Sequence, residues 1–475
     1  MNLIPILIFW GLAIWGVSGP PYRLLYLFFG SLAFGSFAVV SPSLTAGLTL
    51  TPTYIIMLMT IIKVLLNKDG MVFFLAQAMK RNRLLLLFLF WVVAVVITLF
   101  MPRLFAGEVS IIPVRFTGFT LGDPLTPTSQ NFSQLAYLSI SIAYVFATFR
   151  LLRNAEYYGY LIKAILLGAV LVVVTGALDY LDYFVDIDPL LAPFRTASYA
   201  LLVEVEIMGG KRVVGLMPEA SAYGSLCVFF LCLVHFFRDA IPQTWVRERL
   251  APALVLLLIL FIWMSTSSAA YVGLAAFLLV AVSEWSGRRS TLYLSMHKNR
   301  RFGFEFWTAW LLLSMLGMIV LFSPDSLDPV VDKMDQLVFN KTETSSYEER
   351  SMWTAVGWQA LRDTWGLGVG MGATRTSSFI AAVFSNVGIL GGVLYFGFVA
   401  QILLRKKTLS TDKKYSILLR GVRYAYIPSF IVAILVGTTA DFGSYNAILY
   451  GLALALVSIP DKKENAVREN IYHQI

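Results

Sequence analysis

Residues 83–101 read RLLLLFLFWVVAVVITLFM, in which one arginine precedes eighteen uncharged residues. A helix of this length can cross the ~30 Å hydrocarbon core of a bilayer. Similar runs recur from Leu3 to Pro460, and the 475-residue chain is 58% hydrophobic and 14% charged, with a mean hydropathy of +0.74. This composition excludes a string of soluble domains. We expect an all-α, polytopic integral membrane protein that forms a single transmembrane domain over residues 1–475.

Charge clusters and Gly/Pro turns divide the apolar sequence into thirteen candidate spans, and counts of twelve or fourteen remain open. In two places a single residue separates consecutive spans, which predicts helical hairpins with tight turns at one membrane face. The predicted spans lie near residues 2–17, 23–40, 46–66, 83–101, 131–149, 158–178, 217–237, 251–266, 268–283, 306–322, 378–404, 424–440 and 442–459.

The first run and the two cysteines are interpreted as parts of membrane helices. The run from Leu3 to Val17 has no basic n-region and no small-residue cleavage site, so we expect a retained span rather than a signal peptide. Cys227 and Cys232 both fall inside one apolar run. This placement predicts neither a disulfide framework nor a thiolate metal site.

Lysine and arginine are unevenly distributed over the loops. One set of loops and helix ends holds 27 of the 37 basic residues and 10 of the 28 acidic ones. Cytoplasmic loops carry the excess of Lys and Arg, so this set predicts a cytoplasmic C-terminus and an external N-terminus. The net charge of +9 thus reflects orientation and requires no nucleic-acid partner. The larger loops expected outside, in the periplasm, are residues 102–130, 179–216 and 323–377.

The predicted outer loops contain arginines close to helix ends, against the orientation rule. Arginine presents a planar fork that binds phosphate bidentately and stays charged at any accessible pH. The alternative is that each arginine pairs with one of the 18 acidic residues on the same side. The arginines are Arg103, Arg115, Arg195, Arg212, Arg350, Arg362 and Arg375.

Residues 211–221, KRVVGLMPEAS, lead into the seventh predicted span. Pro218 suits the first turn of a helix, and Glu219 beside it meets the positive end of the helix dipole. Glu219 therefore has a structural explanation. It also has a functional one, because a carboxylate that precedes membrane-buried sequence is costly and can serve as a general base.

The third outer loop contains a predicted helix. Residues 346–349, SYEE, match a capping box and predict an amphipathic helix over 347–365 that lies on the outer membrane surface, with Arg350 near its start.

A glycine-rich turn follows at residues 366–378, GLGVGMGATRTSS. Alternating glycines allow backbone N–H groups to approach an anion, and Arg375 and Ser378 precede the next helix start. We interpret Gly368, Gly370, Gly372 and Ser378 as a phosphate- or pyrophosphate-binding turn; the alternative is a flexible connector. It is not a P-loop, since no Gly-Lys-Ser/Thr follows.

Three stretches carry a resemblance to a known family. They are residues 212–221 (RVVGLMPEAS), residues 264–270 (MSTSSAA), and RSMW at 350–353 continuing through GLGVG at 366–370 to GILG at 388–391. The chain resembles the O-antigen polymerase and O-antigen ligase family of bacterial inner-membrane proteins, particularly its exopolysaccharide-polymerase branch. The resemblance covers about residues 195–400, and the first half matches only in hydropathy.

The resemblance implies a glycosyltransferase of the lipid-linked-sugar (GT-C-like) type without metal or other cofactor. Such proteins transfer a glycan from an undecaprenyl-pyrophosphate carrier to an acceptor sugar hydroxyl at the periplasmic face. It also implies a chain-length regulator and an export machinery as partners, besides the lipid bilayer. Ser267-Ser268 stands where many relatives have Ser-Arg, which Arg195 could replace, and Arg375 and Ser378 occupy the region where ligases carry a histidine. Both departures favour a polymerase.

Two functions fit these residues. In the first, Arg212, Arg350 and Arg375 hold the pyrophosphate, Arg195 assists, and Glu219 orients or deprotonates the acceptor hydroxyl. In the second, a transporter or flippase uses the same arginines to bind an anionic lipid-linked glycan without chemistry. Transporters tend to show repeated halves and broken helices, and the sequence shows no convincing internal repeat.

Overall fold

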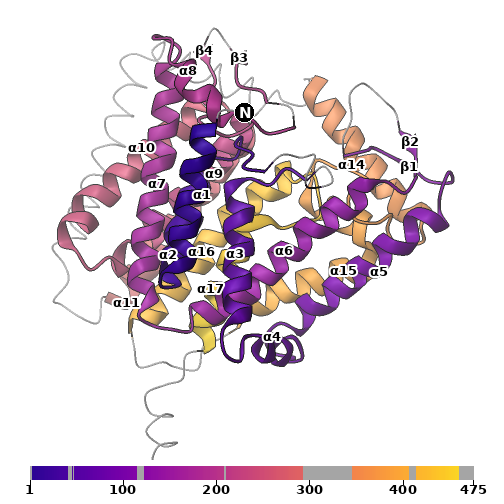
Figure 1. Ribbon diagram of the computed structural model, residues 1–475, viewed down its shortest axis with the longest axis horizontal. Helices are drawn as coiled ribbons and strands as arrows, with labels where there is room; N and C mark the ends of the chain where they lie inside the picture. The colour runs from indigo at the N-terminus through magenta and orange to yellow at the C-terminus, as the bar shows by residue number, and fades with distance from the viewer. Residues whose placement is uncertain are drawn as a thin grey trace, which may run out of the picture.

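The computed structural model describes residues 3–40, 45, 48–114, 122–199, 201–207, 210–292, 345–405 and 413–458. This part of the chain is mostly helical, with two short antiparallel strand pairs (Figure 1). The helices are α1 (Leu3–Ser18), α2 (Tyr22–Ser31), α3 (Pro52–Leu66), α4 (Gly70–Ala78), α5 (Leu85–Leu104), α6 (Ser129–Leu151), α7 (Tyr157–Leu181), α8 (Asp188–Leu191), η2 (Ala192–Phe194), α9 (Ala220–Phe236), η3 (Arg238–Ala240), the π-helical turn η4 (Val246–Leu250), α10 (Ala251–Met264), α11 (Ser268–Leu292), α14 (Ser345–Asp363), α15 (Phe379–Leu404), α16 (Lys413–Val436) and α17 (Gly443–Ser458). The strands are β1 (Ser110–Ile111), β2 (Asp123–Pro124), β3 (Glu206–Ile207) and β4 (Gly210–Lys211).

The helices have the length and composition of a polytopic membrane protein. Within the described residues, six helical segments are long and apolar enough to cross a bilayer, and they belong to α5, α6, α7, α11, α15 and α16. Four shorter apolar helices are α1, α3, α9 and α17. The number of spans stays a prediction, and the expected span at 306–322 lies outside the described residues.

The span predicted over 23–40 is not a single helix. α2 ends at Ser31, and residues 32–40 form no helix. The backbone groups of Ser36 bond to the 196–216 segment: its N–H donates to Leu216 O at 2.9 Å, and its carbonyl accepts from Thr196 N and Ala197 N at 2.9 Å each. Protein partners thus satisfy this apolar, non-helical backbone.

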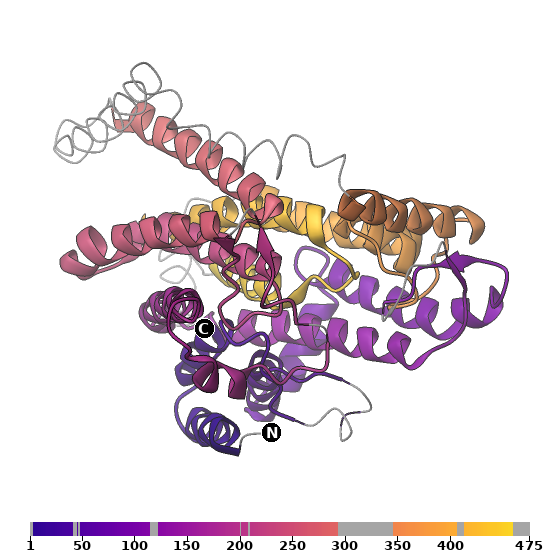
Figure 2. The same cartoon turned by 90° about the horizontal axis from the view of Figure 1, so that it is seen from above.

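Close helix contacts build the core. α6 packs against α17, where a Cβ added at Gly451 would lie 1.9 Å from Thr148 Oγ1, so only glycine permits this approach. Buried tyrosine hydroxyls satisfy one another, with Tyr450 Oη 2.8 Å from Tyr395 Oη and 2.9 Å from Tyr426 Oη. α5 packs on α15, and α11 packs on α9 and α16 while its far end projects from the bundle (Figure 2).

The segments expected to be outer loops gather at one end of the bundle. In Figure 1 the N-terminus, α8, the β3–β4 pair and α14 lie toward the upper end, and α4 lies at the opposite end. The helix predicted over 347–365 is present as α14, which begins two residues earlier. Its buried side packs against α15 and β1, so its apolar face is covered by protein.

Candidate functional site

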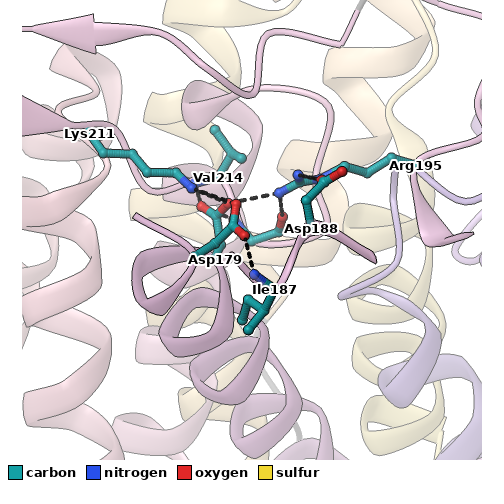
Figure 3. A network of polar contacts seen from close by, with 8 residues as sticks. Asp179, Ile187, Asp188, Arg195, Lys211 and Val214 are labelled. Carbon is teal, nitrogen blue, oxygen red and sulfur yellow. Dashed lines mark hydrogen bonds and ion pairs between the residues drawn. The ribbon is translucent and has the colours of Figure 1, made fainter. Parts of the chain in front are cut away.

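A buried carboxylate holds the segment that leads into α9. Asp179, at the end of α7, is fully buried, and its Oδ2 accepts from Val214 N at 2.7 Å and Gly215 N at 3.0 Å (Figure 3). Arg195 Nη2 lies 2.8 Å and Lys211 Nζ 3.4 Å from its Oδ1. Two cations and two backbone donors therefore compensate the buried charge and fix the backbone immediately before Glu219.

Arg195 belongs to this network. Its guanidinium pairs with Asp179 and, at 3.4 Å, with Asp188. The structure thus places Arg195 in the carboxylate pairing that the sequence left open as the alternative to substrate binding. Its role is to position the 211–219 segment.

Arg212 reaches the tight turn between α10 and α11. Its Nε donates to Thr266 Oγ1 at 2.8 Å, and Nη2 lies 3.4 Å from Thr266 O. The pKa of the Arg212 guanidinium is lowered by burial. The nearby Glu219 and Tyr271 raise this pKa, and the positive charge of Arg350 lowers it. Glu219, Tyr271 and Arg350 are therefore within electrostatic reach of this guanidinium. The Arg212–Thr266 hydrogen bond also brings residues 212–221 and 264–270 together in space.

Arg375 lies against α14. Its guanidinium carbon is 3.7 Å from the centroid of the Trp353 ring, a cation–π contact. The pKa of the Arg375 guanidinium is lowered by burial. The carboxylate of Glu349 raises this pKa, the positive charge of Arg350 lowers it, and Glu219 raises it. Among the described residues it forms no ion pair, and its buried Nε has no hydrogen-bond partner. Such a donor is suited to a ligand oxygen.

Three separate segments therefore form one charged cluster, which we call the arginine cluster. It consists of Arg212 and Glu219 before and at the start of α9, Arg350 on α14, and Arg375 before α15. Glu219 and Arg350 each act on both Arg212 and Arg375. The predicted convergence of the three arginines is consistent with this arrangement, and the cluster is rich in positive charge.

Glu219 is the N-cap residue of α9 and is half-buried. Its carboxylate does not cap the helix, and instead accepts a hydrogen bond from the Ser221 hydroxyl. It lies within electrostatic reach of two guanidinium groups. The carboxylate can therefore accept a hydrogen bond from a ligand hydroxyl while the arginines bind an adjacent anion.

The glycine-rich turn is a packing turn. Val369 N donates to Ser385 O at 2.9 Å, and Gly370 N donates to Asn386 O at 3.0 Å. Gly368 N donates to Thr364 Oγ1, at 3.0 Å. The expectation that these backbone donors face an anion is therefore wrong for this conformation, because protein acceptors use them.

The remaining residues of this turn also have structural roles. A Cβ added at Gly372 would lie 2.7 Å from Gln130 O, so this glycine permits close contact with α6. Ser378 is the N-cap residue of α15 but makes no side-chain cap hydrogen bond. The contact of α14 with this region is direct, since Ser377 N donates to Thr354 Oγ1 at 3.2 Å.

An apolar groove of about 570 Å³ lies elsewhere, among α1, α2, α3 and α7. Its lining has no charged side chain and includes Phe9, Leu27, Phe37, Leu171 and Phe194. In a bilayer such a groove accommodates hydrocarbon chains and offers no group for catalysis.

No role was assigned from the sequence to two acids. Asp179 lies at the end of an apolar helix, a position that marks a costly and therefore partnered charge. Asp441, the second acid, lies between α16 and α17, where apolar sequence flanks it on both sides. No family model matches the chain, and no curated protein sequence matches it.

Proposed function

We propose that the protein polymerises lipid-linked oligosaccharide units into a cell-surface polysaccharide. The donor is an undecaprenyl-pyrophosphate glycan, and the acceptor is a sugar hydroxyl of another unit. The protein is a metal-independent, GT-C-like glycosyltransferase of the bacterial inner membrane, with its site on the periplasmic face and its C-terminus in the cytoplasm. The resemblance of residues 195–400 motivates this proposal.

The observation that carries it is the arginine cluster. A pyrophosphate leaving group needs neutralisation of its charge, and Arg212, Arg350 and Arg375 supply three permanent cations beside one acceptor carboxylate. The Arg375 guanidinium is fixed by its contact with the Trp353 ring. Its Nε has no hydrogen-bond partner within the described residues and can donate to an oxygen of the ligand.

The reaction requires no external energy source. The acceptor hydroxyl oxygen attacks the anomeric carbon, and the bond from that carbon to the pyrophosphate oxygen breaks. Glu219 takes the hydroxyl proton, and the pyrophosphate leaves with the bonding electron pair while the arginines stabilise its charge. Positioning of the two sugars supplies the rest of the catalysis.

Glu219→Gln tests this mechanism. The substitution keeps the size of the side chain but removes the proton acceptor, so polymer formation should fall ~10²-fold or more while the lipid-linked donor still binds. The measurement is the ladder of multiples that the purified protein makes from lipid-linked units. Glu206→Gln changes an exposed residue of β3; it is the matched control and should retain wild-type activity. Wild-type ladders from Glu219→Gln would remove Glu219 from the mechanism.

A transporter or flippase of the same anionic glycan is the second candidate. Two features favour it: the non-helical segment after α2, and a break in α15 at Gly388, where φ is 71° and ψ is 180°. Discontinuous helices are typical of transporters. The two functions differ in where the lipid-linked substrate accumulates when the arginine cluster is removed. It accumulates on the periplasmic face if the protein is a polymerase and on the cytoplasmic face if the protein is a transporter.

A further inference from the structure

A second polar cluster surrounds Asp441, next to the arginine cluster. Asp441 lies in the connector between α16 and α17, and its Oδ1 accepts from Gly443 N at 3.1 Å. Among the described residues it forms no ion pair. Burial raises its pKa to about 6, against the effects of the Gly443 N–H and the Ser141 hydroxyl. As a whole residue Asp441 is half-buried, but its carboxyl group is enclosed by protein.

Ser141, on α6, places its hydroxyl beside the Asp441 carboxyl. Its Oγ lies near enough to Asp441 to stabilise the carboxylate, yet it makes no hydrogen bond of normal geometry within the described residues. The residue is fully buried. A buried hydroxyl without a proper partner destabilises the protein, so its presence beside an unpaired acid indicates a ligand.

Two aromatic rings form the next part of the cluster. Tyr54, on α3, is within electrostatic reach of Asp441, and its ring centroid is 4.7 Å from that of Tyr137 on α6. Both tyrosines are half-buried. The Tyr137 hydroxyl is held by Thr49, to whose carbonyl it donates at 3.1 Å and from whose N–H it accepts at 2.9 Å. This pair of rings is thus fixed in place.

The two clusters share their boundaries. Thr376 N, one residue after Arg375, donates at 3.3 Å to Thr438 O in the connector that carries Asp441. On the other side, Thr49 Oγ1 lies 2.6 Å from Ser198 Oγ, and the same 198–202 segment pairs with Glu219 through Leu202. The segments that carry the two clusters are therefore direct neighbours.

We propose that Asp441, Ser141 and the paired rings of Tyr54 and Tyr137 form a saccharide-binding subsite that holds the acceptor sugar. An unpaired carboxylate repels phosphate, and a single acid gives too few ligands for a divalent cation. A sugar supplies what this site accepts, which is several hydroxyl donors and an apolar C–H face that packs on aromatic rings. That the bound sugar is the acceptor of the transfer reaction rests on the proposed function, whereas saccharide binding at this site is independent of it.

The experiment measures binding and elongation separately. The probe is the oligosaccharide repeat unit released from its lipid by mild acid, and it is titrated into the purified full-length protein. Asp441→Asn should weaken its binding tenfold or more, and Ser141→Ala about threefold. Binding of sugar-free undecaprenyl pyrophosphate should stay within twofold of wild type. Asp363→Asn, an exposed acid on α14, is the matched control and should behave as wild type.

Ser141→Ala keeps the test decisive if the Asp441→Asn protein does not fold. Removal of a buried hydroxyl that has no hydrogen bond of normal geometry should leave the stability of the protein equal or higher. Wild-type affinity for the oligosaccharide in both variants would overturn the subsite, and so would its displacement by millimolar methylammonium, which would mark a cation site. If the wild-type protein makes no polymer but its saccharide binding still depends on Asp441, the subsite stands and the polymerase fails. If polymer forms and the Asp441→Asn protein elongates with an unchanged acceptor KM, the polymerase stands and the subsite fails.

Discussion

Asp179 and Asp441 are carboxylates enclosed by protein, but their partners differ. Asp179 interacts with Arg195, Lys211 and two backbone N–H groups, whereas Asp441 accepts from one backbone N–H, lies beside the Ser141 hydroxyl and forms no ion pair within the described residues. Full compensation is typical of a structural charge. An uncompensated acid costs stability, and such a cost is common where a residue has a function.

This difference predicts a pH-dependent effect of Asp441→Asn. The pKa of Asp441 is raised from 3.8 to about 6, so between those values the folded protein keeps a proton that the unfolded chain has released. The free energy of unfolding therefore falls as pH rises through this window. Asp441→Asn should equal wild type near pH 4 and exceed it by about 1–2 kcal/mol at pH 8.

Thermal unfolding in detergent at the two pH values measures this effect. Among the described residues, Tyr54 and Tyr395 are titratable side chains within electrostatic reach of Asp441, and a tyrosine does not change charge between pH 4 and pH 8. A stability gain of the same size at both pH values would show that packing, and not the charge of Asp441, is responsible.

At the scale of single residues, the sequence identified the arginine cluster because charge next to apolar sequence is visible without a structure. Arg212, Arg350, Arg375 and Glu219 all stand at helix ends in the predicted outer loops. Arg195 has the same pattern, and only its distance to Asp179 shows that it is paired. Pairing depends on which loops meet, and no local pattern encodes that.

At the scale of elements, α15 and the glycine-rich turn depend on each other. A Cβ added at Gly388 would lie 2.3 Å from Leu367 O, and Ile389 N donates to Gly366 O at 2.8 Å. The turn thus enters the break in the helix and satisfies the carbonyls of Ser385 and Asn386. The alternating glycines permit this close approach of two backbone segments. An anion-binding turn would have the same composition, so the sequence alone does not distinguish the two.

Gly388→Ala should therefore destabilise the protein by about 3 kcal/mol or more, because it combines a backbone clash with a φ of 71° and a ψ of 180° that side chains avoid. Gly397→Ala, on the same helix, is the control, since its nearest contact would be 3.7 Å away. A thiol-reactive dye that reports exposure of the buried Cys227 and Cys232 measures the unfolding temperature. Equal losses in the two variants would contradict this account of the break.

Hydropathy predicted most helices because a span needs about twenty apolar residues whatever its neighbours are. It failed where an apolar segment is not helical. Residues 32–40 have the composition of a span, but the loop at 196–216 supplies partners for their backbone. A buried extended segment and a helix bury similar side chains, so hydropathy does not separate them.

At the scale of the whole molecule, the division of basic residues predicts the compartment of the site. The 27-to-10 division is a sum over many loops, and no single loop decides it. α14, which carries Arg350, lies with α8 and β3–β4 at the end opposite α4 (Figure 1), and the Thr376–Thr438 hydrogen bond joins the Arg375 segment to the connector that carries Asp441. If the basic loops are cytoplasmic, both clusters face the periplasm, where lipid-linked units would be polymerised.

Single cysteines on the two faces test this orientation. Glu348 on α14 and Asn82 after α4 are exposed, while Cys227 and Cys232 are fully buried and give little background. A membrane-impermeant maleimide should label Glu348→Cys in cells with a permeabilised outer membrane and label Asn82→Cys only after lysis. The inverse pattern would place both clusters in the cytoplasm. There the proposed polymerase would have no access to exported units, and the arginine cluster would instead face the compartment from which a flippase takes its substrate.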